Sequence, residues 1–307
     1  MYRFFLILFF VLPALVPAQN LTDGLMMSKG DFCTGFVYTY DTWRSYWEGT
    51  LNRQNGNIGR VSTQAITYMG NYGISAKANL MAMVPYVATK ASAGTMRGLE
   101  GVQDLTLGLK YRLLRKGEDK VRYFTLFGVG IVSTPLSNYT PDYLPFSIGL
   151  QSTNVSGRLT ANYTHYHKYY VNVSGGYTWR SNVTLDRPSY FTDGRIFYTD
   201  EVWMPNVFDY NIELGRIKNG LQVTLSYQQQ NTLGGADIRR QDMPFVSNRM
   251  NFGRVGALVM YYLPFHGQLA VRAMVNQTVS GRNVGESTTL LGGLLYTFHI
   301  IKPTSSN

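Results

Sequence analysis

The sequence predicts an all-β protein: a transmembrane, antiparallel, up-and-down β-barrel of about twelve strands. Three observations lead to this prediction. Apolar and polar residues alternate along many long segments, the links between these segments alternate between short and long, and only 15% of the residues are charged, against roughly 25% in a typical soluble domain. Because lipid offers the backbone no hydrogen-bond partners, strands can span a membrane only as a closed sheet.

The first segment of the chain is typical of a secretory signal peptide. Arg3 precedes an apolar run over residues 4–16, and Ala18 supplies the small residue that a cleavage site needs. The run is too short for a membrane-spanning helix, which needs about 20 residues. We therefore expect residues 1–18 to be a signal peptide and residues 19–307 to form one outer-membrane β-barrel.

The strands are predicted from alternation with a period of two. Over residues 221–228, for example, Leu225 belongs to an apolar face and Thr224 to a polar one. Roughly 9–11 tilted residues cross the hydrocarbon of a membrane, and the predicted segments are long enough to do so. They lie near residues 33–49, 58–70, 73–84, 101–114, 120–134, 152–166, 168–181, 204–217, 221–233, 251–263, 267–280 and 286–299. We expect residues such as Leu107, Val173 and Leu225 to face lipid.

The links between the predicted strands alternate in length. The long ones are residues 50–57, 85–100, 135–151, 182–203, 234–250 and 281–285, and the short ones are residues 71–72, 115–119, 167, 218–220 and 264–266. Outer-membrane barrels have short periplasmic turns and longer external loops. We therefore expect residues 182–203 outside the cell and the turn Arg115–Asp119 in the periplasm.

The polar face of the strands is predicted to line the lumen. Charged residues at membrane depth are tolerated where they face water or each other, so the charged residues of this face are the candidate selectivity residues. Basic residues outnumber acidic ones among them, which leaves two interpretations open: a conduit with weak anion selectivity, or a salt-bridged interior that stiffens the barrel. The candidates are Lys77, Lys110, Arg112, Arg158, Arg180, Asp209, Glu213, Arg254 and Arg272.

Several classes of function find no support in the sequence. The net charge is +10, but the basic residues are scattered singly, which argues against nucleic acid as a partner. Cys33 is the single cysteine, and His165 and His167 have no Cys, Asp or Glu close by, so we expect no metal site. A Gly-x-Ser-x-Gly elbow and a phosphate-binding glycine loop are both missing. We expect no enzyme, no catalytic residues and no cofactor.

One stretch resembles a known family. Residues 101–112 read Gly-Val-Gln-Asp-Leu-Thr-Leu-Gly-Leu-Lys-Tyr-Arg and follow a Val-Pro-Tyr at residues 84–86. This is similar to the outer-membrane proteins of the putative meta-pathway of phenol degradation family, which are loosely related to fatty-acid and aromatic-hydrocarbon channels. Gln103 replaces the second glycine of the family motif. The residues that match the motif are Gly101, Asp104, Gly108, Lys110, Tyr111 and Arg112.

The resemblance implies a channel or transporter in the outer membrane of a Gram-negative bacterium. Its solutes would be small and hydrophobic or aromatic, with anionic compounds among the candidates, and passage would be passive. The alternative is a structural or partner-binding barrel without transport. The expected partners are outer-membrane lipids, an unidentified small-molecule solute and the barrel-assembly machinery, and no nucleic acid.

Overall fold

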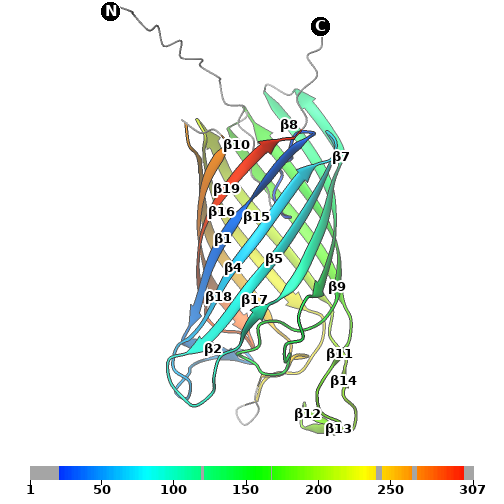
Figure 1. The fold of residues 1–307 in the computed structure, drawn as a ribbon, viewed down its shortest axis with the longest axis vertical. Coiled ribbons are helices and arrows are strands. Elements are labelled where there is room, and N and C mark those ends of the chain that lie inside the picture. Colours follow the sequence, from blue (N-terminus) through cyan, green and yellow to red (C-terminus); the bar gives the residue numbers. More distant parts are fainter. Residues whose placement is uncertain (1–20, 119–120, 167, 240–243, 265–267, 301–307) are drawn as a thin grey trace, which may run out of the picture.

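A computed structural model describes residues 21–118, 121–166, 168–239, 244–264 and 268–300. Within these residues, twelve long antiparallel strands form one closed barrel (Figure 1). The barrel closes because β1 pairs with β19 on one side and with β4 on the other. The long strands are β1 (Asp31–Trp43), β4 (Val61–Gly73), β5 (Ala78–Ala91), β7 (Asp104–Glu118), β8 (Arg122–Pro135), β9 (Asn154–His165), β10 (Tyr169–Arg180), β15 (Val207–Lys218), β16 (Leu221–Thr232), β17 (Asn251–Tyr262), β18 (Leu269–Arg282) and β19 (Thr288–His299).

The predicted fold class is confirmed, but two predicted turns are displaced along the chain. Residues 71–72 belong to β4, and the turn follows Gly73. Arg115 and Lys116 belong to β7, which continues to Glu118 because a bulge between Arg112 and Leu114 takes up one extra residue. The predicted signal peptide, residue His167 and the end of the second turn, Asp119, lie outside the described residues.

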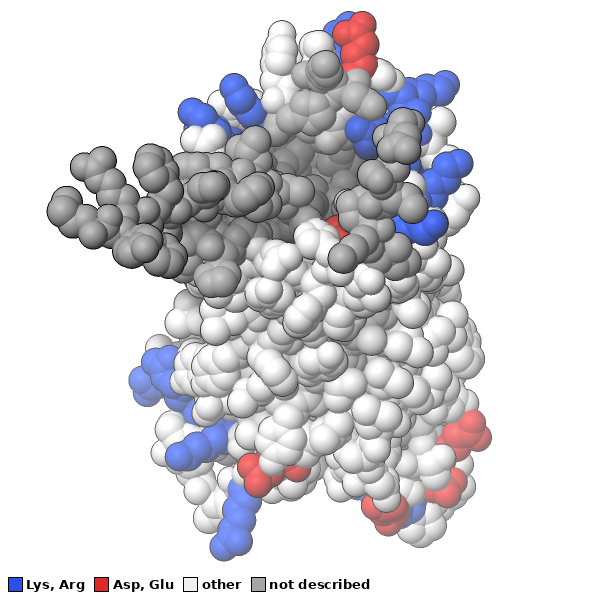
Figure 2. Space-filling model, turned by 45° about the horizontal axis from the view of Figure 1, so that its top comes forward, with Lys and Arg blue, Asp and Glu red and all other residues white. Residues whose placement is uncertain are grey.

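The outer face of the barrel is apolar, as the alternation predicts. Leu107, Val173 and Leu225 are 44%, 49% and 59% exposed, so the prediction that they face outward is confirmed. Figure 2 shows Lys, Arg, Asp and Glu gathered at the two ends of the barrel, with a broad uncharged belt between them. Such a belt is what a barrel presents to the hydrocarbon of an outer membrane.

The two ends of the barrel differ in their connections (Figure 1). Short turns, the start of β1 and the end of β19 lie at one end, which the general rule for such barrels places in the periplasm. Much of the positive charge sits at this rim, in the exposed residues Lys77, Lys116, Arg122, Lys168, Arg216 and Lys218. The external end carries the long loops and six short strands: β2 (Ser45–Glu48), β3 (Leu51–Gln54), β11 (Val183–Thr184), β12 (Tyr190–Thr192), β13 (Arg195–Phe197) and β14 (Glu201–Val202). The remaining strand, β6 (Glu100–Val102), pairs with β5.

The external loops pack against one another into what we call the loop cap, residues 136–153, 181–206, 233–239 and 244–250. The ring of Tyr190 stacks against Phe197 and Phe245 at 5.1 Å from each centroid. At the edge of the cap, Arg282 donates two hydrogen bonds to Asp237 and holds the pKa of that carboxyl below its usual range. These contacts give the long loops a fixed conformation.

One loop of the cap reaches into the external mouth of the barrel. Thr89 faces inward on β5 and donates a hydrogen bond of 2.7 Å to the carbonyl oxygen of Phe146. Tyr139 packs with Val87 and Ile148, and its hydroxyl donates to Asp104 at 2.6 Å. Residues 139–148 therefore narrow the lumen at its external end.

The topology predicts where a protease cuts whole cells. We expect trypsin to cleave after Arg187 or Arg195, whose side chains are 47% and 74% exposed in the external loop between β10 and β15. Lys116 lies near the periplasmic end and should be cut only after the outer membrane is permeabilised. Mass spectrometry of the fragments identifies the sites, and cleavage at Lys116 in intact cells would contradict the orientation.

A second prediction uses neighbouring residues on opposite faces of β16. Leu225→Arg places a charge in lipid and should cost roughly 2–4 kcal/mol of unfolding free energy. Ser226→Arg places the same charge in the lumen, where Ser226 lines a cavity, and should cost much less. Urea unfolding in lipid vesicles measures both values, and equal costs would mean that the two faces are assigned wrongly.

Candidate functional site

A segment of the chain that precedes the first strand lies inside the barrel. We call residues 21–29 the plug. A Cβ added at Gly108, on the inner face of β7, would lie 2.4 Å from Cδ2 of Leu21. A Cβ added at Gly24 would lie 2.5 Å from the side chains of both Asn162 and Asn172. The plug thus fills space that these inward-facing strand residues leave open.

The plug is held by an ion pair in the barrel interior. The side chain of Lys110 is completely buried, and its Nζ donates hydrogen bonds to the carboxylate of Asp23 at 2.7 Å and to the carbonyl oxygen of Asp23 at 2.5 Å. The same carboxylate accepts a hydrogen bond from the backbone N–H of Leu25 at 3.0 Å. A buried charge is costly unless it is paired, so the plug supplies the partner that Lys110 requires.

A row of polar side chains crosses three neighbouring strands beside the plug. Asn162 on β9 donates to Asn172 on β10 at 2.6 Å. Asn172 donates in turn to one carboxylate oxygen of Glu213 on β15 at 2.8 Å, and Asn211 donates to the other oxygen at 2.8 Å. Both oxygens of Glu213 therefore have a neutral donor.

A second buried ion pair joins Arg158 and Asp209. The guanidinium of Arg158 on β9 reaches across β10 to the carboxylate of Asp209 on β15, and it also donates to Ser174 at 2.7 Å. It passes over Gly176, where an added Cβ would lie 3.0 Å from the guanidinium. Arg158 is thus neutralised inside the protein, as the salt-bridged interpretation of the lumen expects.

The inner surface of the barrel differs between two sets of six strands. Most inward residues of β7, β9, β10, β15 and β16 are polar, whereas β8 between them carries the buried Phe127 and Val129; we call these six strands the polar wall. The other six strands carry an apolar cluster between their periplasmic ends and their middle, which packs against Met27 of the plug. We call this cluster the apolar wall: Cys33, Val37, Met69, Met83, Leu258, Met260, Leu291 and Leu295.

A cavity of about 340 Å³ lies between the two walls. Leu21, Thr22 and Asp23 of the plug form one side of what we call the lumen cavity. The polar wall contributes Asn211, Glu213, Gln222, Thr224, Ser226 and Gln228. β5, β17 and β18 contribute Met83, Arg254, Leu258, Met260, Arg272, Met274 and Asn276.

The two arginines of the lumen cavity differ from the other buried cations. In the part of the chain that the structure describes, no carboxylate lies within 4.0 Å of Arg254 or Arg272. Arg254 donates to Thr278 at 3.1 Å and lies 4.1 Å from the ring centroid of Phe252. The Nε of Arg272 is buried and has no hydrogen-bond partner.

Other residues of the predicted set lie away from this cavity. Lys77 is exposed in the turn between β4 and β5, so it does not line the lumen; the alternation misplaced it because β5 begins at Ala78 and not at residue 73 as expected. Arg112 lines a hollow at the periplasmic opening, together with Leu25 and Arg115. Arg180 is partly buried at the external end of β10, where its backbone N–H donates to Asn206.

Comparison with known proteins identifies the family. Residues 56–291 match the family described as "Putative MetA-pathway of phenol degradation". The chain belongs to this family. The resemblance inferred from residues 84–112 is therefore confirmed. None of the curated proteins matches the chain.

Several solved structures are similar to this chain. An outer membrane channel from Pseudomonas putida F1 is 14% identical, covers 92% of this chain and 100% of its own, and superposes with a TM-score of 0.70. The NanC porin is 7% identical, with coverages of 85% and 98% and a TM-score of 0.47. The CymD monoaromatic hydrocarbon channel is 11% identical, with coverages of 89% and 90% and a TM-score of 0.42. This chain is an outer-membrane β-barrel.

The family motif connects the plug with the loop cap. Asp104 holds Tyr139 in the external mouth, and Gly101 leaves room for Ile148, whose Cδ1 lies 3.3 Å from an added Cβ. Gly108 leaves room for Leu21, and Lys110 binds Asp23. Tyr111 of the motif faces lipid and is 44% exposed. The motif therefore fixes both segments that narrow the lumen.

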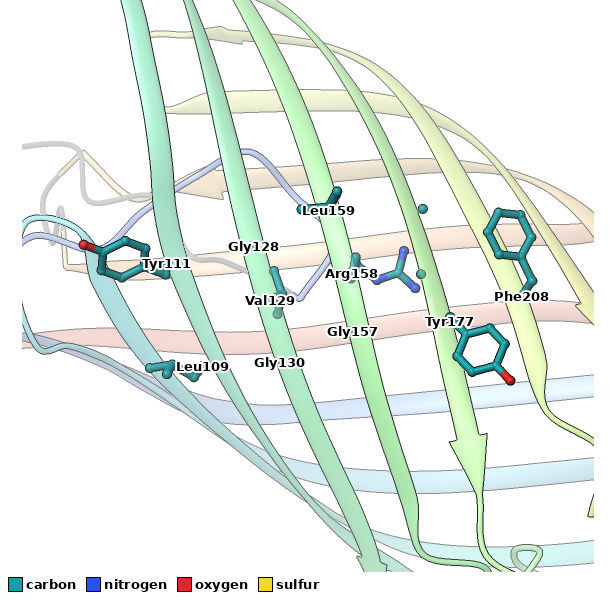
Figure 3. Close-up of a pocket in the computed structure, with 12 residues that line it drawn as sticks. Leu109, Tyr111, Gly128, Val129, Gly130, Gly157, Arg158, Leu159, Tyr177 and Phe208 are labelled. Atoms are coloured by element: carbon teal, nitrogen blue, oxygen red, sulfur yellow. The ribbon is translucent and has the colours of Figure 1, made fainter.

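A second hollow lies on the outer face, where Leu109, Tyr111, Tyr177 and Phe208 form its apolar rim (Figure 3). Its base consists of outward-facing glycines, which have no side chain to fill the surface: Gly128, Gly130, Gly157 and Gly175. This dent faces the lipid and is separated from the lumen by the backbone of β8, β9 and β10.

The residues that the structure describes lack two further types of feature. They contain no helix long and apolar enough to cross a membrane. They also contain no group of three or more His, Cys, Asp or Glu residues that could hold a metal ion.

Sequence reasoning missed two features of this site. The plug has no alternating pattern, so nothing in residues 21–29 indicates that Asp23 meets Lys110. The apolar wall was missed because apolar residues were assigned to the lipid face. Its signal is the pair Met81 and Met83, which are apolar residues at inward positions of β5.

The Lys110–Asp23 pair should control how firmly the plug is held. Asp23→Asn removes the carboxylate that Lys110 contacts at 2.7 Å, and breaking a buried ion pair costs about 3–5 kcal/mol in other proteins. We expect a cysteine introduced at Thr22 to react faster with a water-soluble maleimide in the Asp23→Asn background. Adding Lys110→Met removes the buried positive charge and should partly restore the slow rate.

The matched control for this labelling experiment is Asp193→Asn, which removes an acidic residue in an exposed external hairpin. It should leave the rate at position 22 unchanged. Equal labelling rates in the parent protein and the Asp23→Asn variant would show that other contacts hold the plug.

Proposed function

We propose that this barrel is a passive channel or transporter for small hydrophobic or aromatic solutes, anionic ones included. The observation that carries the proposal is the apolar cluster of the inner surface, whose methionines lie across the lumen cavity from polar side chains. A lumen meant for water-soluble solutes alone would have no use for methionines and leucines beside its cavity.

The chemistry of the apolar wall supports this class of solute. Methionine side chains are unbranched and polarizable, adapt to differently shaped partners and make favourable contacts with aromatic rings. Met83 and Met260 line the lumen cavity opposite the donors and acceptors of Asn211 and Gln222. A solute with an apolar body and one polar group can therefore contact both walls at once.

The dimensions of the lumen fit slow passage of small molecules. Eight-stranded barrels are filled by their side chains, and 16–18 strands enclose a wide aqueous channel. Twelve strands lie between these limits, and here the plug and residues 139–148 narrow the two ends. A solute passes only when one of these segments shifts, so the conductance for ions should be small.

The alternative function is a structural or partner-binding barrel without transport. The observation that favours it is the buried pair between Lys110 and Asp23, which fixes the plug inside the lumen. Outer-membrane lipids and the barrel-assembly machinery are partners that both functions require, because any such barrel must be inserted into the membrane.

Uptake by proteoliposomes distinguishes the two functions. We expect liposomes with the protein to take up benzyl alcohol and benzoate faster than empty liposomes, and to take up arabinose no faster. Met83→Gln puts an amide into the apolar wall and should lower the rate for benzyl alcohol about threefold to tenfold, since a loss of roughly 1 kcal/mol of apolar contact is involved.

The matched control is Met250→Gln, the same substitution outside the apolar wall, at the end of an external loop. Its uptake rates should equal those of the parent protein. If the parent protein takes up neither aromatic compound and shows no conductance in planar bilayers, the alternative without transport is the correct one.

A further inference from the structure

We propose that the lumen cavity is a binding site for an amphipathic monocarboxylate, whose carboxylate binds Arg272 and whose apolar body lies against the neighbouring methionines. This inference rests on the proposed function and deepens it, because it names the class of solute and the place that holds it.

The first argument is the state of the buried cations. Lys110 has Asp23 as a partner, and Arg158 has Asp209. Arg272 has no carboxylate within 4.0 Å among the described residues, and its Nε is buried without any acceptor. A buried guanidinium is costly when its N–H groups lack acceptors. Arg272 therefore requires an acceptor that the described part of the chain does not provide.

The geometry of the guanidinium selects the head group. Its N–H donors form a planar fork that matches the two oxygens of a carboxylate. The acids that line the same cavity, Asp23 and Glu213, attract Arg272 but lie more than 4.0 Å from it and make their hydrogen bonds elsewhere. The carboxylate of Asp23 accepts from Lys110 and Leu25, and both oxygens of Glu213 accept from asparagine side chains.

The contacts of the charged groups favour one carboxylate on the ligand. Lys110 pairs with Asp23, and Arg254 donates to Thr278, lies over the ring of Phe252 and is attracted by Asp41. Arg272 has a buried Nε without an acceptor. A monocarboxylate supplies one acceptor group to Arg272, whereas a dicarboxylate leaves a second buried anion without a partner.

The surroundings of Arg272 select the apolar body. Arg272 lies on β18, one of the six strands that carry the apolar wall, and its cross-strand partner on β17 is Met260. Met274 and Leu258 line the cavity beside it. The volume of about 340 Å³ lies at the lower end of the range for ligand pockets, roughly 300–1,000 Å³. A short alkyl chain or one aromatic ring fits this space.

Calorimetric titration of the detergent-solubilised full barrel tests the site with three probes: octanoate, octan-1-ol and octanedioate. We expect the parent protein to bind octanoate at least tenfold more tightly than either of the others. Arg272→Gln should weaken octanoate binding at least tenfold and leave octan-1-ol unchanged. Met274→Gln should weaken both, because it changes the surface that the apolar body contacts.

Two further variants serve as controls. Arg216→Gln removes an arginine from the outer face near the periplasmic rim and should change no affinity. Arg272→Lys keeps the charge but loses the planar fork, so its affinity for octanoate should lie between those of the parent and of Arg272→Gln. The heat-dependent shift on a denaturing gel checks that each variant is folded, and Arg272→Lys keeps the test decisive if Arg272→Gln does not fold.

The proposal is overturned if Arg272→Gln binds octanoate as tightly as the parent, or if it loses octanoate and octan-1-ol equally. Failure of the proposed function has a different signature. Octanoate binding that depends on Arg272, in liposomes that take up no aromatic compound, would leave the site standing and remove the transport. Uptake of benzyl alcohol without Arg272-dependent binding would leave the transport standing and remove the site.

Discussion

Closure of the sheet is the constraint on which the rest of the structure depends. Lipid offers no hydrogen bonds, so every backbone group at membrane depth must find its partner in a neighbouring strand. The pairing of β1 with both β4 and β19 completes that ring. Once the ring is closed, the period of two decides which side chains face lipid and which face the lumen. Each inward side chain must then find its partners inside a space enclosed on all sides.

Because the lumen is enclosed, a charged side chain inside it is costly unless it has a partner there. Lys110 is paired with Asp23 of the plug, a segment that belongs to no strand. Arg158 on β9 is paired with Asp209 on β15, which it reaches across Gly176 of β10. Two of the lumen cations are thus paired within the protein, while Arg254 and Arg272 have no carboxylate within 4.0 Å among the described residues. Arg272 stands out against this pairing, since it lies among apolar side chains and has a buried donor without an acceptor.

Much of the fold could be predicted from the sequence because the pattern that predicts it is local. Alternation gave the twelve strands and the lipid-facing side of Leu107, Val173 and Leu225. The Lys110–Asp23 contact could not be predicted, because it joins residues 87 positions apart and one of them lies in a segment without periodicity. The bulge in β7 has no sequence signal either, and it shifted the expected turn. The apolar wall was missed because a strand with apolar residues on both faces shows no alternation.

The division of the lumen follows the order of the strands, and this has a consequence for any solute inside. The polar wall comes from six strands that are consecutive around the ring, β7 to β16, and the apolar wall comes from the other six. The apolar wall covers the barrel from its periplasmic end to its middle, and beyond it the same strands carry inward polar residues such as Asp41 and Thr289. Within the part that the apolar wall covers, a molecule with one polar end can keep that end on the same wall. Because it never has to turn its polar group toward the methionines, passage does not require the loss of its hydrogen bonds, which would cost about 1–3 kcal/mol for a neutral group.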